Sequence, residues 1–210
     1  MPSIARPALR FVLASAVAMA AAPARAADEL PPERPTTPYR AKVRNTFRVT
    51  EPGGGKSGGD TIEIRVSGAR LFEDSQIMEQ KDVIVDTEQR SVIEFDPKAE
   101  DKVAARFALN DAPIPYVQGR TALAAFDPKW GPPTIAGKDR VAKHACTILH
   151  YGDPEHDGIA ACVSNEGVVL RAKLVFPDAE REFEVLDFDP GEQDETWFQP
   201  PKEFRVVDGG

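Results

Sequence analysis

The sequence predicts a mainly β protein, built on one antiparallel sheet with one or two short helices. Short runs that alternate apolar and polar residues are the pattern of strands with one buried face. Polar turn sequences separate these runs, as residues 87–90 (TEQR) separate 76–86 from 91–95. The chain also holds 19 prolines and 15 glycines, a composition that favours turns over helices.

Residues 1–26 have the pattern of a secretory signal peptide. Arg6 and Arg10 precede an apolar stretch at 11–22 (FVLASAVAMAAA), and Ala24 and Ala26 form a small-x-small cleavage site. The apolar stretch is shorter than the about 20 residues that span a bilayer, so cleavage is expected rather than an uncleaved anchor. No second apolar segment approaches that length, and the mature chain is expected to be exported without an integral membrane segment.

The charge of the chain is acidic, with a formal net value of −8. Cleavage after Ala26 removes three arginines and makes the mature chain more acidic still. Such a charge repels nucleic acid and anionic membrane surfaces, so neither is expected as a partner. The sequence leaves the oligomeric state open.

The first part of the mature chain predicts a leader followed by strands. Residues 27–38 (ADELPPERPTTP) hold four prolines without apolar periodicity, so an extended leader is expected before a single domain at 39–210. Residues 39–50 and 61–66 alternate as strands. Between them, 52–59 (PGGGKSGG) predicts a flexible loop. It does not fit a phosphate-binding loop, because a strand and not a helix follows it.

The rest of the chain predicts mostly strands. Residues 101–109 (DKVAARFAL) fit either a helix or a strand, and residues 118–126 (QGRTALAAF) predict a short helix. The further elements are hairpin strands at 76–86 and 91–95, strands at 168–176 and 183–188, and a hydrophobic end at 197–198 and 204–207.

The two cysteines lie in the most regular part of the chain, residues 143–176. A loop at 152–156 places Tyr151 opposite Asp157 and Cys146 opposite Cys162 in a hairpin. Cβ atoms of opposed residues are about 4.5–5.5 Å apart, which is close enough for a disulfide after a small adjustment. Because exported proteins are oxidised, we expect a disulfide between them.

A metal site is the alternative for this hairpin, because His144, Cys146 and His150 share one strand face with Cys162 opposite. However, His144 and His150 are about 20 Å apart along a strand, too far for one tetrahedral ion. His156 lies in an acidic turn that lacks the spacing of a calcium loop. We therefore expect no metal and no other cofactor.

Catalytic residues are not expected either. The sequence has no G-x-S-x-G elbow, and a disulfide would occupy both thiols. Aromatic residues are frequent in the C-terminal half, where they fit an ordinary core or, alternatively, a partly open apolar cleft.

Four segments resemble a known family: 135–137 (IAG), 144–147 (HACT), 161–171 (ACVSNEGVVLR) and 197–207 (WFQPPKEFRVV). They are similar to exported proteobacterial proteins of the periplasmic lipoprotein-carrier (LolA/LolB-like) superfamily. The resemblance covers about residues 135–207 and is faint over 39–126. Ser164 and Asn165-Glu166 stand where the family has Thr and Asp, and a proline-rich coil stands where the carriers open with an amphipathic helix.

The resemblance implies a strongly curved antiparallel half-barrel whose concave face is plugged by helical or loop elements. In the carriers this face takes up lipid acyl chains, and no motif residue carries chemistry. We therefore expect a non-catalytic periplasmic protein that binds a lipid or lipoprotein, with an envelope interaction module with a filled core as the alternative. The residues expected to bind the ligand are Phe107, Leu123, Phe126, Trp130, Leu149, Leu170, Leu174 and Trp197.

Overall fold

The computed structural model describes residues 29–50, 55–74 and 81–209. The predicted signal peptide (1–26) lies outside the described residues, as do the first two residues of the leader. Residues 51–54 and 75–80 also lie outside them, and with them the start of the predicted loop at 52–59 and the start of the predicted strand at 76–86.

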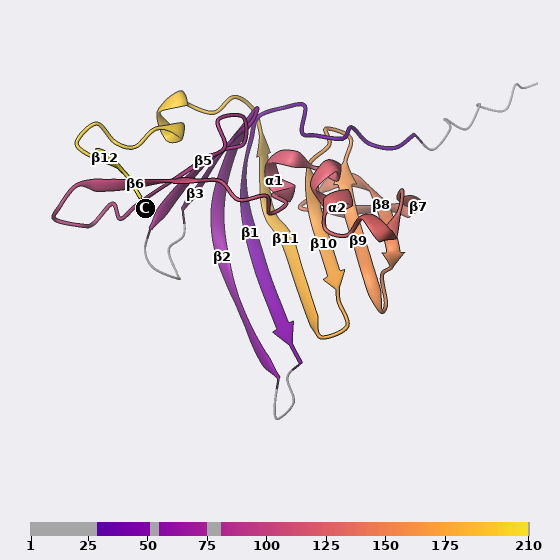
Figure 1. Cartoon of the computed structure of the whole chain (residues 1–210). Helices are drawn as coiled ribbons and strands as arrows, with labels where there is room; N and C mark the ends of the chain where they lie inside the picture. Colours follow the sequence, from indigo (N-terminus) through magenta and orange to yellow (C-terminus); the bar gives the residue numbers. More distant parts are fainter. Residues whose placement is uncertain (1–28, 51–54, 75–80, 210) are drawn as a thin grey trace, which may run out of the picture.

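The described residues form one open 12-stranded sheet (Figure 1) with the order β12-β6-β5-β4-β3-β2-β1-β11-β10-β9-β8-β7. All neighbouring strands are antiparallel except β6 and β12, which are parallel. The strands are β1 (Tyr39–Val49), β2 (Lys56–Ser67), β3 (Arg70–Asp74), β4 (Asp82–Asp86), β5 (Ser91–Phe95), β6 (Val103–Ala108), β7 (Thr134–Val141), β8 (His144–Asp153), β9 (Asp157–Ser164), β10 (Val169–Val175), β11 (Ala179–Pro190) and β12 (Arg205–Asp208). This confirms the predicted class, a mainly β curved half-barrel with two short helices.

The helices lie over one face of the sheet, in front of β9, β10 and β11 (Figure 1). They are α1 (Pro115–Gln118) and α2 (Arg120–Ala125), followed by the 3-10 turn η1 (Pro128–Trp130). Gly119 joins α1 to α2 with a φ of 56°, a conformation that favours glycine. A second 3-10 turn, η2 (Glu195–Phe198), lies between β11 and β12. We call the face under α1 and α2 the inner face and the opposite one the outer face.

Strand alternation sorts the apolar residues between the two faces. On the inner face, Val43 lies opposite both Ile62 and Val185. This face carries the main core, whose members range from 0% to 7% exposed. Its largest fully buried side chains include Tyr39, Tyr151, Ile64, Leu123, Leu149, Ile159, Leu170 and Leu174.

The outer face carries a second core under the C-terminal segment. Phe72 lies opposite Ile84, and Phe95 lies opposite Ala104. The segment that includes η2 covers them and contributes two phenylalanines to a cluster formed by Phe72, Ile84, Phe95, Ala104, Phe198 and Phe204. The predicted hydrophobic end of the chain therefore closes the outer face of β3–β6.

Residues 29–38 have no regular secondary structure, and they are packed against the sheet and α2. The Arg120 Nε donates to the Pro31 carbonyl at 2.8 Å, and the Thr36 amide donates to the Glu166 carbonyl at 2.8 Å. A Cβ at Gly119 would lie 2.7 Å from the Glu33 carbonyl oxygen. The leader is thus part of the fold over residues 31–36.

The disulfide forms as predicted, between Cys146 and Cys162 with Cα atoms 5.4 Å apart. The predicted register of β8 and β9 is wrong by two residues, because Cys146 lies opposite Ser164 and Ile148 lies opposite Cys162. Asp153 accepts the Glu155 amide at 3.0 Å, and this short turn lets β8 continue to Asp153 and β9 begin at Asp157. A shift of two residues keeps each side chain on its face, so the disulfide joins diagonal neighbours.

One further segment differs from its prediction, and one that was left open is decided. Residues 56–59 of the predicted loop belong to β2, because they pair with the end of β1. Residues 101–109, which fitted a helix or a strand, hold β6, paired with β5 on one side and β12 on the other. In both segments pairing with a neighbouring strand determines the structure.

Candidate functional site

The candidate site is a cavity of about 690 Å³ on the inner face. It lies where β1, β2 and β11 continue beyond the end of α1 and form a long blade (Figure 1). Its walls are Asn45, Thr46, Phe47, Gly58, Gly59, Asp60, Ile62, Glu73, Tyr116 and Arg181.

Cross-strand pairing brings the blade residues of the cavity together. Asn45 of β1 lies opposite Asp60 of β2, and Phe47 lies between Gly58 of β2 and Arg181 of β11. The Phe47 ring covers Gly58, since a Cβ there would lie 2.7 Å from the ring. Phe47 nevertheless remains 46% exposed, and its ring provides an apolar wall that solvent still reaches.

Tyr116 closes the cavity on the side of α1. Its hydroxyl donates to the Asn45 Oδ1 at 3.0 Å, and its ring packs edge-on against Phe183 with centroids 5.3 Å apart. The Tyr39 hydroxyl donates to the Tyr116 carbonyl at 2.7 Å. Burial raises the pKa of both tyrosines, so both hydroxyls stay neutral and act as donors.

Strand β3 contributes one carboxylate to the cavity, that of Glu73. It lies opposite Ile64, on the inner face and half-buried. Burial raises the pKa of its carboxyl, Asp60 adds a further increase, and Arg181 opposes it. No hydrogen bond or ion pair joins the Glu73 carboxylate to another of the described residues. The cavity thus combines an apolar wall with the carboxylates of Glu73 and Asp60 and the guanidinium of Arg181.

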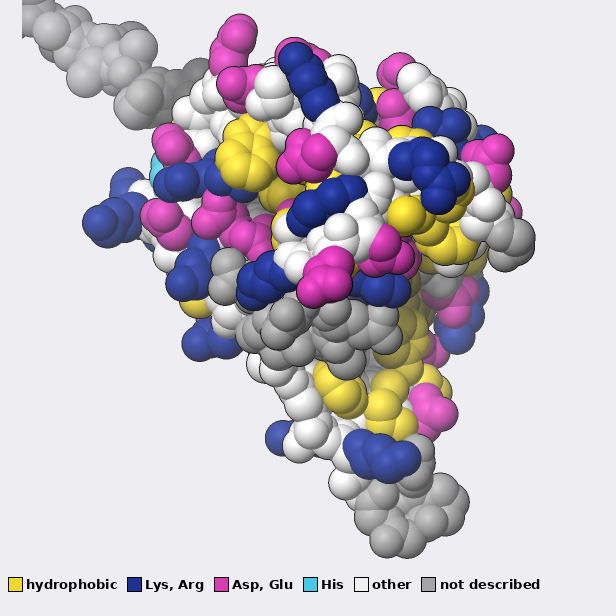
Figure 2. Space-filling view, turned by 90° about the vertical axis from the view of Figure 1, so that its left-hand side faces the viewer, with side chains coloured by type: hydrophobic (Ala, Val, Ile, Leu, Met, Phe, Trp, Pro, Cys, Tyr) yellow, Lys and Arg dark blue, Asp and Glu magenta, His cyan; other side chains and the backbone are white. Residues whose placement is uncertain are grey.

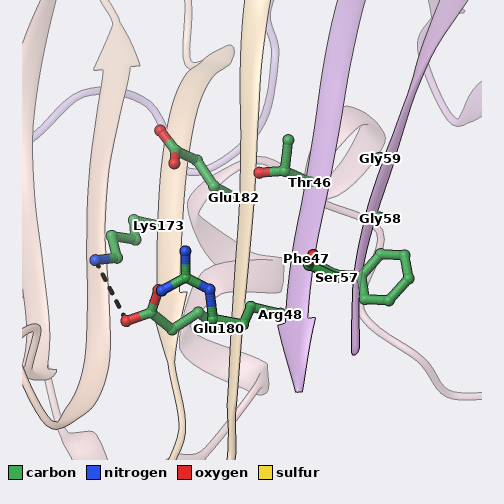
Figure 3. Close-up of a pocket in the computed structure, with 9 residues that line it drawn as sticks. All are labelled: Thr46, Phe47, Arg48, Ser57, Gly58, Gly59, Lys173, Glu180 and Glu182. Atoms are coloured by element: carbon green, nitrogen blue, oxygen red, sulfur yellow. Dashed lines mark ion pairs between the residues drawn. The ribbon is translucent and has the colours of Figure 1, made fainter. Parts of the chain in front are cut away.

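The outer face of the same blade is polar. A depression of about 360 Å³ there shares Thr46, Phe47, Gly58 and Gly59 with the cavity, and its other lining residues are polar or charged, among them Arg48 and Glu182. Lys173 pairs with Glu180 in it at 3.6 Å (Figure 3). The inner face offers an apolar ligand more wall than the outer face, because Ile62 lines only the cavity.

The surface continues the apolar wall of the cavity. Figure 2 shows hydrophobic side chains along the narrow lower part of the molecule, which the blade forms, whereas acidic and basic side chains are mixed over the wider part. Phe47, near the end of β1, is among the exposed large hydrophobic residues.

Most of the residues predicted to bind a ligand lie in the filled part of the inner face. Leu123, Leu149, Leu170 and Leu174 are 0–1% exposed and pack in the main core. Phe126 and Trp130 pack against that core. The Trp130 Nε1 donates to Asp157 at 3.1 Å. Helix α2 fills this part of the half-barrel.

The structure separates the other two predicted residues from this group. Phe107 is on the inner face of β6, where Gly209 covers it, since a Cβ on Gly209 would lie 2.2 Å from its ring. Trp197 lies on the outer face, where the Arg65 guanidinium stacks 3.7 Å from its ring centroid. All eight residues are described by the structure, and none of them lines the cavity.

The residues that do line the cavity include several that the sequence analysis did not select. Asp60 precedes Ile62 by two positions, so the alternation that predicted that strand also places Asp60 on its inner face. Glu73 and Tyr116 had no such signal, because they come from β3 and α1, far from β1 in the sequence.

The described residues contain no group of three or more His, Cys, Asp or Glu side chains suited to a metal ion. The His156 Nδ1 lies 3.0 Å from Asp153 Oδ2 within the β8–β9 turn, and the His144 ring packs edge-on against Phe188. Within residues 29–50, 55–74 and 81–209, no helix has the length and apolarity needed to cross a membrane.

Known structures with a similar fold include an uncharacterized conserved protein from Thermus thermophilus. It aligns with a TM-score of 0.50 and 9% identity, covering 82% of this chain and 91% of that one. The structure of MucB aligns with a TM-score of 0.48 and 19% identity, over 80% of this chain and 60% of that one. No protein-family model matches the sequence, and neither does any curated protein.

A LolA superfamily protein from Nitrosomonas europaea also aligns, with a TM-score of 0.37 and 10% identity, covering 79% of this chain and 91% of that one. One of the aligned structures is thus from the LolA superfamily, which the sequence resembles. At these identities the likeness describes the fold alone.

Proposed function

We propose that this protein is a non-catalytic periplasmic protein that binds a hydrophobic ligand, a lipid or the acyl chain of a lipoprotein, in the cavity beyond α1. The cavity itself is the observation that carries this proposal. Its volume of about 690 Å³ lies within the range of about 300–1,000 Å³ that is typical of ligand sites. Phe47 and Ile62 supply apolar walls, and Asn45 and Tyr116 supply a few polar groups, as such sites require.

The position of the cavity differs from the one that the sequence predicted. Leu123 and its neighbours fill the inner face under α2 with 0% exposure at Leu123 itself, so a ligand there would have to displace the helix. The cavity beyond α1 needs no such displacement. We therefore assign the ligand to the blade.

An envelope interaction module without a ligand is the second candidate. The observation in its favour is the same filled core under α2, which leaves that part of the half-barrel with no room for an acyl chain.

Native mass spectrometry with solvent extraction of the purified protein tests the choice. The proposal expects a co-purifying lipid, or uptake of dodecanol by the delipidated protein. A clean apo mass together with no measurable dodecanol binding by calorimetry would favour the interaction module and refute ligand binding.

The position of the site is tested by two matched variants. Phe47→Ala removes the exposed apolar wall and is expected to weaken dodecanol binding about tenfold. Leu186→Ala is the control, because Leu186 is similarly exposed at 42% but does not line the cavity. It should leave the affinity unchanged, and equal weakening by both variants would contradict the assignment to the cavity.

A further inference from the structure

The charged residues around the cavity indicate which head group an apolar ligand there would carry. Glu73 and Asp60 bring two carboxylates to its wall, and Arg181 brings one guanidinium. Arg181 is exposed at the rim, whereas Glu73 and Asp60 are half-buried. The carboxylates are therefore less screened by water than the guanidinium, and the wall has an excess of negative charge.

Two groups in the wall respond to this excess. At Glu73, burial raises the pKa of the carboxyl. Repulsion from Asp60 raises it further, and the attraction of Arg181 lowers it by less. At the Tyr116 hydroxyl, Glu73 is the strongest charged influence, ahead of Arg181. Both contributions have the sign expected of a wall that holds more carboxylates than cations.

Glu73 also has unused hydrogen-bonding capacity. No hydrogen bond or ion pair connects its carboxylate to the described part of the chain, and a half-buried carboxylate without a partner is costly. A cation entering the cavity would supply that partner through a charge-assisted hydrogen bond. A carboxylate or phosphate head would instead meet two like charges.

We propose that the cavity selects amphiphiles with one aliphatic chain and a primary ammonium head, with the chain along Phe47 and Ile62 and the head at Glu73. This inference rests on the proposed function, because the chain must bind before the head can be selected. Asp60 lies opposite Asn45 on the neighbouring strand and adds to the attraction. Asn45 and Tyr116 are already paired with each other and contribute shape more than charge.

The test compares dodecylamine, dodecanol and dodecanoate by calorimetry at pH 7, below the concentrations at which they form micelles. The three probes share a chain length and differ in head charge. We expect dodecylamine to bind about tenfold more tightly than dodecanol, and dodecanoate to bind more weakly than either. Tighter binding of dodecanoate than of dodecylamine overturns the inference.

Glu73→Gln is the decisive variant. In this variant the ratio of the dodecylamine affinity to the dodecanol affinity should fall to about one, and circular dichroism checks that the variant is folded. Asp60→Asn should act in the same direction with a smaller effect. Glu182→Gln is the matched control, because it removes a carboxylate from the outer face of the same blade, and it should change nothing.

The outcomes separate this inference from the function on which it rests. If dodecanol binds but dodecylamine binds no more tightly, or if Glu73→Gln leaves the preference intact, the selection of ammonium heads is refuted and ligand binding stands. If none of the three probes binds, both are refuted.

Discussion

Asp82 shows how strand register sets the chemistry of single residues. It begins β4 directly opposite Asp74 on β3, and Asp96 follows Phe95, its partner on β5. The pKa of Asp82 is raised to about 6, and burial is the largest cause. Repulsion from Asp74 and Asp96 contributes to this increase, and Lys98 opposes it. Like charges placed directly across a ladder destabilise the sheet when both are ionised.

This pKa predicts how stability depends on pH. The folded state binds the Asp82 proton more tightly than the unfolded state does, so this group favours folding at low pH. Its contribution is lost as the pH rises from about 4 to about 6. Asp82→Asn should therefore raise the free energy of unfolding at pH 7 by about 1 kcal/mol, a value reduced for solvent screening, and should bring little gain at pH 4.

Urea denaturation of both proteins between pH 4 and pH 8 checks this expectation. Glu100→Gln, which replaces an exposed carboxylate in the β5–β6 turn, is the control and should show no such pH-dependent gain. An equal effect of Asp82→Asn at both pH values would contradict it.

At the level of elements, the β8–β9 hairpin shows what sequence patterns can and cannot specify. Leu149 and Ala161 lie opposite each other and both are buried, on the face away from the disulfide. The register was wrong by two residues because the turn, with Asp153 accepting backbone amides, is shorter than expected. An error of two leaves the faces unchanged, so the disulfide was still predicted.

The disulfide is expected to stabilise this hairpin. It closes a loop with a sequence separation of 16, for which the chain-entropy estimate is about 3 kcal/mol. The double variant Cys146→Ala/Cys162→Ala should lose about that much free energy of unfolding in guanidinium denaturation. Alkylation of the native protein without reduction should label neither cysteine, and finding two reactive thiols would contradict the pairing.

β6 shows the opposite case, in which local pattern could not decide. Val103, Ala104 and Phe107 have the spacing of a helix face as well as that of a strand. Ala104 is buried against the outer core beside Phe204, and β12 pairs with β6 from about 100 residues later in the chain. Contacts so distant in sequence decide the structure here, and a single sequence does not reveal them.

The C-terminal segment is expected to stabilise the fold through its aromatic residues more than through its charges. Phe204 is 8% exposed and packs on Phe95 with centroids 5.1 Å apart, so Phe204→Ala should cost about 3 kcal/mol. Glu195, which pairs with Arg70 at 2.6 Å, has an exposed side chain, and Glu195→Gln should cost less than about 1 kcal/mol.

Thermal and urea denaturation of these two variants compare the contributions. Because both residues lie on the outer face, dodecanol binding by the folded variants should be unchanged. A larger loss from Glu195→Gln than from Phe204→Ala would contradict this account of the outer core.

At the level of the whole molecule, the inner face of one sheet is filled in one part and holds a cavity in another. Helix α2 and the packed leader fill the inner face at one end, while the blade of β1, β2 and β11 extends beyond α1 and holds the cavity (Figure 1). The half-barrel and its plugged face could be predicted from the resemblance. The position of the cavity could not, because it depends on how far the blade extends past α1.

The proposed location of the ligand is tested most directly by a crystal structure of the protein with a dodecanol that carries a terminal bromine. The account predicts an anomalous bromine peak on the inner face of the blade, in the cavity bounded by Phe47, Ile62 and Tyr116. A peak under α2 among Leu123 and Leu149, or beside Trp197 on the outer face, would contradict it.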